Sequence, residues 1–218
     1  MNDFLQIKLR EIYNSVKNPV LVWRWKRNGK PSPPPQWIKK LLIDEVRMAS
    51  NYRVFIETGT YLGDMVKAQL NSFEKVYSIE LSKPLWTQAK YRFKERKHVS
   101  LLQGDSSYVL PELLENVDEP AIFWLDGHYS GGITALGELE CPVYKELDAI
   151  FGIKFKAHAV LIDDARCFMG KNDYPTLGEL ISYVEKKVQN YHHCLVGDVI
   201  VFLPNHIPLP SLNFYESA

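Results

Sequence analysis

The chain has 218 residues, 46% of them hydrophobic and 24% charged, which suits one globular domain with a sizeable core and argues against disorder. Lys plus Arg and Asp plus Glu both total 26, and this balance argues against a nucleic-acid substrate, because nucleic-acid binders usually carry a basic excess. The sequence contains no signal-peptide pattern and no apolar run long enough to span a membrane, so we expect a cytoplasmic protein.

We expect an N-terminal extension, residues 1–52, that precedes a single α/β domain, residues 53–218. Apolar residues recur at intervals of three and four in two parts of the extension, which predicts two helices. Between them lies a run rich in β-forming residues, which predicts a short strand, and then a proline-rich loop. The predicted elements are a helix at 3–17, a strand at 20–25, a loop at 28–35 and a helix at 37–49.

From residue 53 onward, β-forming runs alternate with helical patterns. This alternation predicts a Rossmann-like, doubly wound, mostly parallel seven-stranded sheet with helices on both faces. The last two strands are separated only by Gly197 and Asp198, so we expect an antiparallel C-terminal hairpin. The predicted strands are 53–57, 75–80, 98–103, 120–126, 157–163, 192–197 and 199–203. The predicted helices are 62–72, 84–96, 107–116, 138–151 and 176–189.

The first of these strands ends in Glu57-Thr58-Gly59-Thr60-Tyr61-Leu62-Gly63, and a helix follows. Glycine allows a backbone to turn sharply and to approach a ligand closely. A turn of this kind after the first strand of a doubly wound sheet is where a nucleotide-like cofactor binds. The dinucleotide pattern G-x-G-x-x-G is absent, so the turn by itself does not identify the cofactor.

Carboxylates end four consecutive predicted strands: Glu57, Glu80, Asp105 and Asp126. Glu80 follows Gly59 by about 20 residues, the spacing at which an acid binds ribose hydroxyls. Asp105 is placed to accept a hydrogen bond from the exocyclic amine of adenine. An N-cap role explains any one of these acids, and for Asp105 both interpretations stay open, but caps alone do not account for four in register.

With these motifs, residues 53–203 resemble the class I S-adenosylmethionine-dependent methyltransferases. The resemblance implies that the first motif holds the methionine part of the cofactor, Glu80 the ribose, and Asp105 with Ser106 the adenine. Tyr61 stands where the family often has glycine, which points to a particular subgroup. The implied cofactor-binding residues are Glu57, Thr58, Gly59, Thr60, Tyr61, Gly63, Glu80, Asp105, Ser106 and Asp126.

A second acidic group follows the fifth strand, at Asp163 and Asp164. Because the fourth and fifth strands are expected to be neighbours, these residues should converge with Asp126. Carboxylates this close raise one another's pKa unless a cation neutralises them, and hard oxygen ligands suit Mg²⁺ or another divalent cation. The alternative is that Asp163 caps the next turn and Asp164 pairs with Arg166.

This arrangement resembles the macrocin type of metal-dependent sugar O-methyltransferases. The resemblance implies a metal held by Asp126, Asp163 and Asp164, and a glycan or other small-molecule acceptor. Asp126 and His128 are the implied catalytic residues: His128 stands where that type usually has an Asp base, and a neutral imidazole can accept a hydroxyl proton. In families of this type an N-terminal extension often selects the acceptor or forms dimer contacts, so a homodimer stays open.

Three other interpretations remain. An NAD-dependent reductase is suggested only by the pair Tyr183 and Lys187, and the G-x-G-x-x-G motif is missing. A nucleic-acid or protein methyltransferase often carries Asn/Asp-Pro-Pro-Tyr/Phe after the fourth strand, where this chain has Asp126-Gly127-His128-Tyr129. A catalytically inactive binding protein is disfavoured by the presence of all the expected acids.

Overall fold

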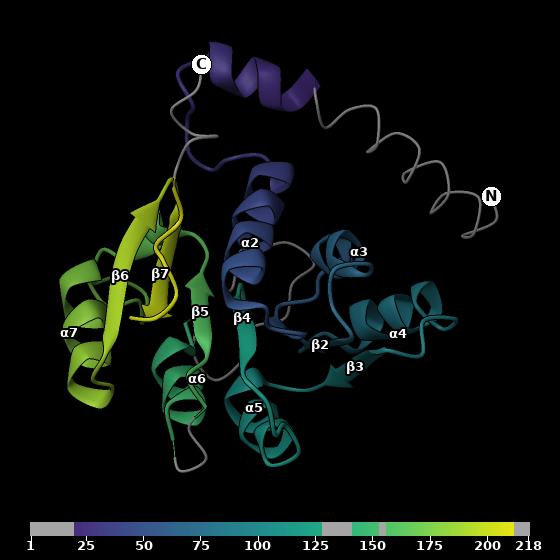
Figure 1. Cartoon of the computed structure of the whole chain (residues 1–218). Coiled ribbons are helices and arrows are strands. Elements are labelled where there is room, and N and C mark those ends of the chain that lie inside the picture. The colour runs from purple at the N-terminus through teal and green to yellow at the C-terminus, as the bar shows by residue number, and fades with distance from the viewer. Residues whose placement is uncertain (1–19, 128–140, 153–155, 212–218) are drawn as a thin grey trace.

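The computed structural model describes residues 20–127, 141–152 and 156–211, which form a central sheet with helices on both faces (Figure 1). Its strand order is β3-β2-β1-β4-β5-β7-β6, and β7 alone runs in the direction opposite to the other strands. The prediction of a mostly parallel, Rossmann-like sheet with an antiparallel C-terminal hairpin is therefore confirmed. The strands are β1 Val54–Thr58, β2 Lys75–Glu80, β3 Val99–Gln103, β4 Ala121–Leu125, β5 Ala159–Ile162, β6 Tyr191–Val196 and β7 Val199–Pro204.

Each strand lies within two residues of its predicted bounds, and β2 matches them at both ends. The central strands β4 and β5 are buried along their whole length, as expected for apolar runs covered on both faces.

The described helices connect the strands and cover the sheet. Their bounds are α2 Gln36–Ser50, α3 Asp64–Gln69, α4 Lys83–Arg92, α5 Ser106–Leu114, α6 Val143–Ile150 and α7 Leu177–Lys187, with a 3₁₀ turn at Ala165–Cys167. Helix α7 begins with a capping box, in which Thr176 and Glu179 satisfy each other's backbone N–H groups. The described helices include no segment whose length and hydropathy would let it cross a lipid bilayer.

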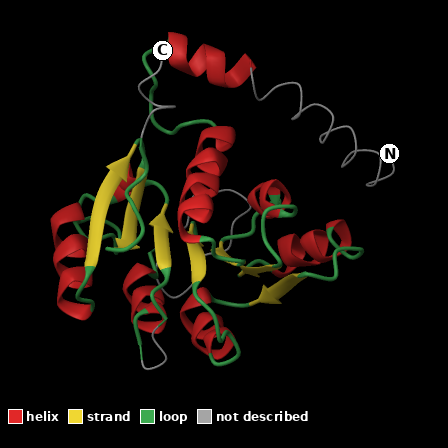
Figure 2. Cartoon of the chain, viewed as in Figure 1, coloured by secondary structure: helices red, strands yellow, loops and turns green. Residues whose placement is uncertain are grey.

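The helices form two layers, and the sheet lies between them (Figure 2). Helices α2, α3 and α4 bury Leu42, Met65 and Ala89 against one face of the sheet. Helices α5, α6 and α7 bury Leu110, Leu147 and Leu180 against the other. Each of these helices thus buries its apolar stripe against a face of the sheet, and the ends of the strands stay uncovered by the helices.

Helix α2 lies in the segment predicted as an extension, and it packs directly on the sheet. Its residues Leu42, Ile43 and Val46 are at most 1% exposed and contact the same apolar cluster as Trp124 of β4. The helix ends at Asn51, whose left-handed backbone (φ +58°) turns the chain into β1. Its first turn consequently lies at the edge of the sheet where the parallel strands end.

The predicted strand at 20–25 is wrong, because residues 20–27 are helical (Figure 1). The β-forming residues of this run have no neighbouring strand to pair with among the described residues, and propensity alone does not hold a strand. The helix instead buries Trp25, which is 7% exposed and whose Nε1 donates to the carbonyl of Pro31 at 2.7 Å, while Trp23 stays 59% exposed.

Candidate active site

The carboxyl ends of the five parallel strands β3, β2, β1, β4 and β5 meet along one edge. Thr58 of β1 pairs with Leu125 of β4, and Leu125 pairs in turn with Ile162 of β5. On the other side Glu80 of β2 pairs with Gln103 of β3. The acids predicted from the sequence therefore follow one another along a single edge, which we call the carboxyl edge.

The turn after β1 has a left-handed backbone conformation that residues other than glycine rarely adopt. Gly59, Tyr61 and Gly63 all have positive φ, at +83°, +48° and +74°. A Cβ on Gly59 would come within 2.2 Å of the carbonyl oxygen of Asp126, so this position requires glycine. Tyr61, although it has a side chain, also takes the left-handed conformation and carries its strain. The turn is thus closed tightly against the end of β4.

Glu80 holds this turn through backbone hydrogen bonds. Its carboxylate accepts from the N–H of Tyr61 at 2.7 Å and from the N–H of Ser82 at 2.8 Å. Burial raises the pKa of Glu80, and these two N–H donors act against that rise. The carboxylate is consequently fixed in place at the end of β2 before any ligand binds.

Glu57 is 1% exposed and lies beneath the same turn. The hydroxyl of Ser78 donates to its Oε2 at 2.5 Å, and the hydroxyl of Thr60 lies 2.6 Å from that of Ser78. Burial raises the pKa of Glu57 well above its ordinary value. A cationic group arriving at this edge would therefore be stabilised by Glu57.

Asp105 is the N-cap of α5. Its Oδ1 accepts from the backbone N–H of Ser107 at 2.9 Å and from the Ser107 hydroxyl at 2.6 Å. The capping alternative left open by the sequence is therefore present, and it orients Asp105 at the end of β3. Ser106, the first residue of the helix, is 8% exposed.

Asp126, Asp163 and Asp164 form an acidic corner at the ends of β4 and β5, and Lys39 of α2 enters it. The ammonium of Lys39 donates to Oδ2 of Asp163, and the side chains of the pair are only 10% and 1% exposed. Burial acts to lower the pKa of Lys39, but Asp163, Asp126 and Asp164 together raise it. Lys39 therefore stays charged among the three carboxylates.

The acids of the corner differ in their other partners. Burial, then the charge of Asp163, raises the pKa of Asp126 well above its usual range. Burial raises the pKa of Asp163 to about 6, and its Oδ1 also accepts from the N–H of Asp164 at 2.8 Å. Asp164 has a left-handed backbone and forms an ion pair with Arg166 at 2.8 Å. Arg166 also pairs with the buried Asp198.

The side chains of the acidic corner fit an ammonium better than a divalent ion. Asp163 and Asp164 are each engaged by a cationic side chain, Lys39 and Arg166. A divalent ion needs several free oxygen ligands, and the described residues contain no group of three or more His, Cys, Asp or Glu arranged to hold one. Metal binding at Asp126, Asp163 and Asp164 stays a prediction that this arrangement does not support.

Glu146 of α6 is a further buried acid at the edge, and it lies close to Gly127, where the chain leaves β4. It is 0% exposed and lies beside the hydroxyls of Ser106 and Thr58, although neither makes a well-aligned hydrogen bond with it. A Cβ on Gly127 would lie 3.4 Å from its Oε1. Burial raises the pKa of Glu146 to about 7.

The sequence interpretation missed both Lys39 and Glu146, although a signal for each was present. Lys39 precedes Leu42, Ile43 and Val46 by three, four and seven residues, so a lysine stands on the apolar stripe of its helix. Glu146 lies on the apolar stripe of α6 in the same way, three residues after Val143. A charged residue on a stripe that packs against the sheet must have a buried partner or a raised or lowered pKa.

Two predicted residue sets lie elsewhere. His128, the implied base, is outside the described residues. Tyr183 and Lys187, the pair behind the reductase alternative, both contact Asp148 of α6, with the ion pair at 2.6 Å. This contact joins α7 to α6, and it accounts for the pair without any role at the carboxyl edge.

No family model and no curated protein sequence matches the chain. Solved structures do match. An O-methyltransferase from Bacillus cereus, in complex with S-adenosylhomocysteine, has 12% identity and a TM-score of 0.56 over 89% of this chain and 96% of its own. An O-methyltransferase from Streptomyces achromogenes involved in tomaymycin synthesis, in complex with S-adenosylmethionine, has 15% identity and a TM-score of 0.53 over 84% and 86%.

A methyltransferase from Podospora anserina, bound to S-adenosylhomocysteine, has 14% identity and a TM-score of 0.52 over 93% of this chain and 96% of its own. In each of the three cases the similarity covers at least 84% of this chain and at least 86% of the other. The chain therefore has the fold of the class I S-adenosylmethionine-dependent methyltransferases.

Proposed function

We propose that this chain is an S-adenosylmethionine-dependent O-methyltransferase that acts on a hydroxyl group of a small-molecule acceptor. The observation that carries the proposal is the carboxyl edge itself, where Glu57, Glu80, Asp105 and Asp126 follow one another beside a tightly closed turn. Solved methyltransferases of the same fold bind S-adenosylmethionine or its product, which supports the same cofactor here.

The charge of the edge suits this cofactor. S-adenosylmethionine supplies a methyl group on a positively charged sulfur and also carries an ammonium group. Glu57 and Glu80 are buried acids whose pKa burial raises, so a nearby positive charge would restore their preference for the ionised form. Fixed carboxylates of this kind stabilise a cation more effectively than water does, because they need not reorganise.

The individual roles follow from position along the edge. Glu80, fixed by two backbone N–H groups, is proposed to accept the ribose hydroxyls. Asp105 and Ser106, at the end of β3, are proposed for the adenine. The methionine part is assigned to the turn and to the residue that closes it, which are Glu57, Thr58, Gly59, Thr60, Tyr61, Gly63 and Asp126.

His128 is proposed as the base, an assignment that rests on its position two residues after Asp126 in the sequence. A neutral imidazole near pH 7 can accept the proton of a hydroxyl group as its oxygen attacks. The chain's main contribution to the rate would be to hold acceptor and cofactor in line at short distance. A sugar or a related natural product is the proposed acceptor, on the resemblance of Asp126, Asp163 and Asp164 to sugar O-methyltransferases.

No step of this proposal uses a metal, since Lys39 and Arg166 already engage two of the three acids that would hold it. An acceptor of another class, a nucleic acid or a protein, is the alternative within the same fold, and the balanced charge of the chain does not favour a polyanion.

Transfer of a labelled methyl group tests the proposal. The chain is incubated with S-adenosylmethionine labelled in its methyl group and a panel of sugars, oligosaccharides, RNA and protein. We expect label on a hydroxyl of a small acceptor, and we expect His128→Gln to lower kcat by roughly a hundredfold or more. Label found only on RNA or protein would overturn the acceptor class, and an unchanged rate in the variant would remove His128 as the base.

A further inference from the structure

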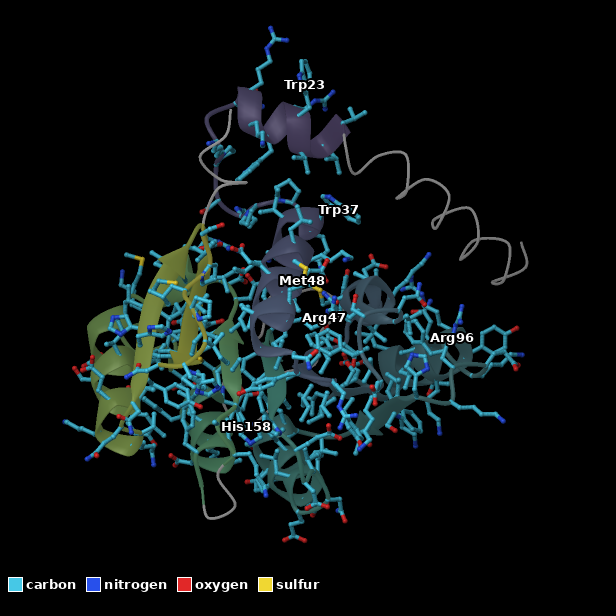
Figure 3. The ribbon with its side chains drawn as sticks, in the orientation of Figure 1. Trp23, Trp37, Arg47, Met48, Arg96 and His158 are labelled. Atoms are coloured by element: carbon cyan, nitrogen blue, oxygen red, sulfur yellow. The ribbon has the colours of Figure 1, made fainter. Side chains whose placement is uncertain are left out.

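Lys39 is a buried cation for which the proposed chemistry has so far no use. It belongs to the first turn of α2, while the acids it meets end β4 and β5 more than 80 residues later in the chain. Figure 3 shows Trp37, two residues before Lys39, at the beginning of α2, and shows His158 at the opposite edge of the sheet. Lys39 therefore enters the site from the helical layer at the carboxyl edge.

Burying the ammonium of Lys39 costs hydration free energy, which its partners must offset. Lys39 is 8% exposed as a residue, and an unpaired ammonium in such a place would lose most of its hydration. Three groups compensate: the ion pair with Asp163, the charges of Asp126 and Asp164, and the ring of Trp124, whose centroid lies 6.0 Å from Nζ. The buried side of the corner is thus packed around the charge of Lys39, while Arg166 pairs with Asp164.

A divalent ion and this ammonium would compete for the same carboxylate. Oδ2 of Asp163 accepts from Lys39, and Oδ1 accepts from the N–H of Asp164, so both oxygens have a donor. Binding a metal there would either require Lys39 to leave a buried pair or place two positive charges beside its ammonium.

We propose that Lys39 takes the place of a divalent metal ion in the acidic corner, so that the protein binds no metal there and its methyl transfer is metal-independent. Lys39 is a positioning residue in this view: its ammonium lies among Asp163, Asp126 and Asp164, and its hydrogen bond orients Asp163 at the end of β5. The statement about catalysis rests on the proposed function, whereas the statement about metal binding does not.

Mn²⁺ titration of the protein without cofactor tests the proposal, because electron paramagnetic resonance reports the free ion directly. We expect the wild type to bind no stoichiometric Mn²⁺. We expect Lys39→Met to acquire one site per chain, at least about tenfold tighter than any wild-type binding, since three carboxylates lose the ammonium that they share. Lys39→Arg and Lys40→Met should gain no site, because the first keeps the charge and the second alters a neighbouring pair with Asp44.

The results separate this inference from the proposed function. One Mn²⁺ per wild-type chain, lost in Asp163→Asn, would overturn the inference, and so would a folded Lys39→Met that gains no site. Should Lys39→Met fail to fold, the titrations of the wild type and of Asp163→Asn decide the matter alone. Chelator-sensitive methyl transfer would also contradict it, whereas absence of any methyl transfer would count against the proposed function only.

Discussion

The carboxyl edge has two halves that hold their acids in different ways. At the ends of β1, β2 and β3, the acids accept from backbone N–H groups and hydroxyls, as Glu80 does from Tyr61 and Ser82. At the ends of β4 and β5, the acids face cationic side chains, as Asp163 faces Lys39. We call these the backbone-held half and the cation-held half.

The difference lies in where the partners come from. Glu80 and Ser82 are two residues apart, and so are Asp105 and Ser107, so short turns build part of the backbone-held half, and its longer contacts, such as Glu80 with Tyr61, span 18 to 21 residues. Lys39 and Asp163 are 124 residues apart and meet only when α2 packs on the completed sheet. The geometry of the cation-held half should therefore depend more strongly on the whole fold, and single substitutions there should lower the free energy of unfolding by more.

The two halves touch at Gly59, so a side chain there should have the largest effect. In Gly59→Ala the new Cβ would lie 2.2 Å from the carbonyl of Asp126, on a backbone with φ +83°. Left-handed strain and the contact together should lower the free energy of unfolding by about 3 to 4 kcal/mol. Urea denaturation measures this.

Gly178→Ala is the control for that change. Gly178 lies in α7, and a Cβ there would meet nothing within 4 Å. It should raise the free energy of unfolding by up to about 1 kcal/mol. Equal effects of the two substitutions would show that the halves are not in tight contact at Gly59.

Removing the charge of Lys39 should have the next largest effect on the free energy of unfolding. Lys39→Met leaves Asp163 buried and without its partner, and should lower the free energy of unfolding by about 3 kcal/mol. Lys40→Met breaks the pair with Asp44 within the same helix and should cost only about 0.5 kcal/mol. Similar losses in the two variants, measured by urea denaturation, would contradict the dependence of the cation-held half on Lys39.

Glu146 lies beneath both halves and should make stability depend on pH. Its pKa is raised from 4.5 to about 7 in the folded state, so the folded state binds more protons than the unfolded state between these values. Its contribution to stability is therefore lost as pH rises through this window. Between pH 4.5 and pH 7, the free energy of unfolding of Glu146→Gln should therefore rise by about 3 kcal/mol relative to that of the wild type. This is the energy that corresponds to a pKa difference of about 2.5.

The difference between variant and wild type isolates this effect, because the contributions of the other titrating groups are the same in both proteins. Urea denaturation at a series of pH values gives the free energy of unfolding of each protein as a function of pH. Glu112→Gln, at an exposed position of α5, should follow the wild type throughout. Parallel curves for Glu146→Gln and wild type would exclude a buried, protonated Glu146.

Tyr61 tests strain in the backbone-held half, with the smallest expected effect. Its φ of +48° costs a tyrosine energy that a glycine would not lose, so Tyr61→Gly should raise the free energy of unfolding by about 0.5 kcal/mol. Tyr91 is similarly exposed but lies within α4, so the same change there should lower the free energy of unfolding by about 0.5 kcal/mol. Urea midpoints that fall in both variants would show that Tyr61 is unstrained.

The same contrast explains how much the sequence could predict. The strands of the sheet were predictable because β4 and β5 are continuous apolar runs and helices alternate with them. The strand prediction for residues 20–25 was wrong because their composition favours β-structure while no described strand lies beside them. Propensity predicted correctly where packing agreed with it.

The positions of Glu57, Glu80 and Asp105 along the carboxyl edge were predictable because each stands at or just after the end of a strand in a sheet whose order the pattern implied. The pairing of Asp163 was not, because the pattern shows where the acids converge and not which cation reaches them. A divalent ion and a lysine from a distant helix satisfy the same electrostatic need, and only the packing of α2 distinguishes them.

The most direct test of the central claim is calorimetric titration with S-adenosylmethionine. We predict one site per wild-type chain, an affinity at least about tenfold lower in Glu80→Gln, because the amide cannot accept from both Tyr61 and Ser82, and no change in Glu74→Gln, an exposed acid next to β2. Binding of NAD in place of S-adenosylmethionine, or equal affinity in Glu80→Gln and wild type, would contradict the account.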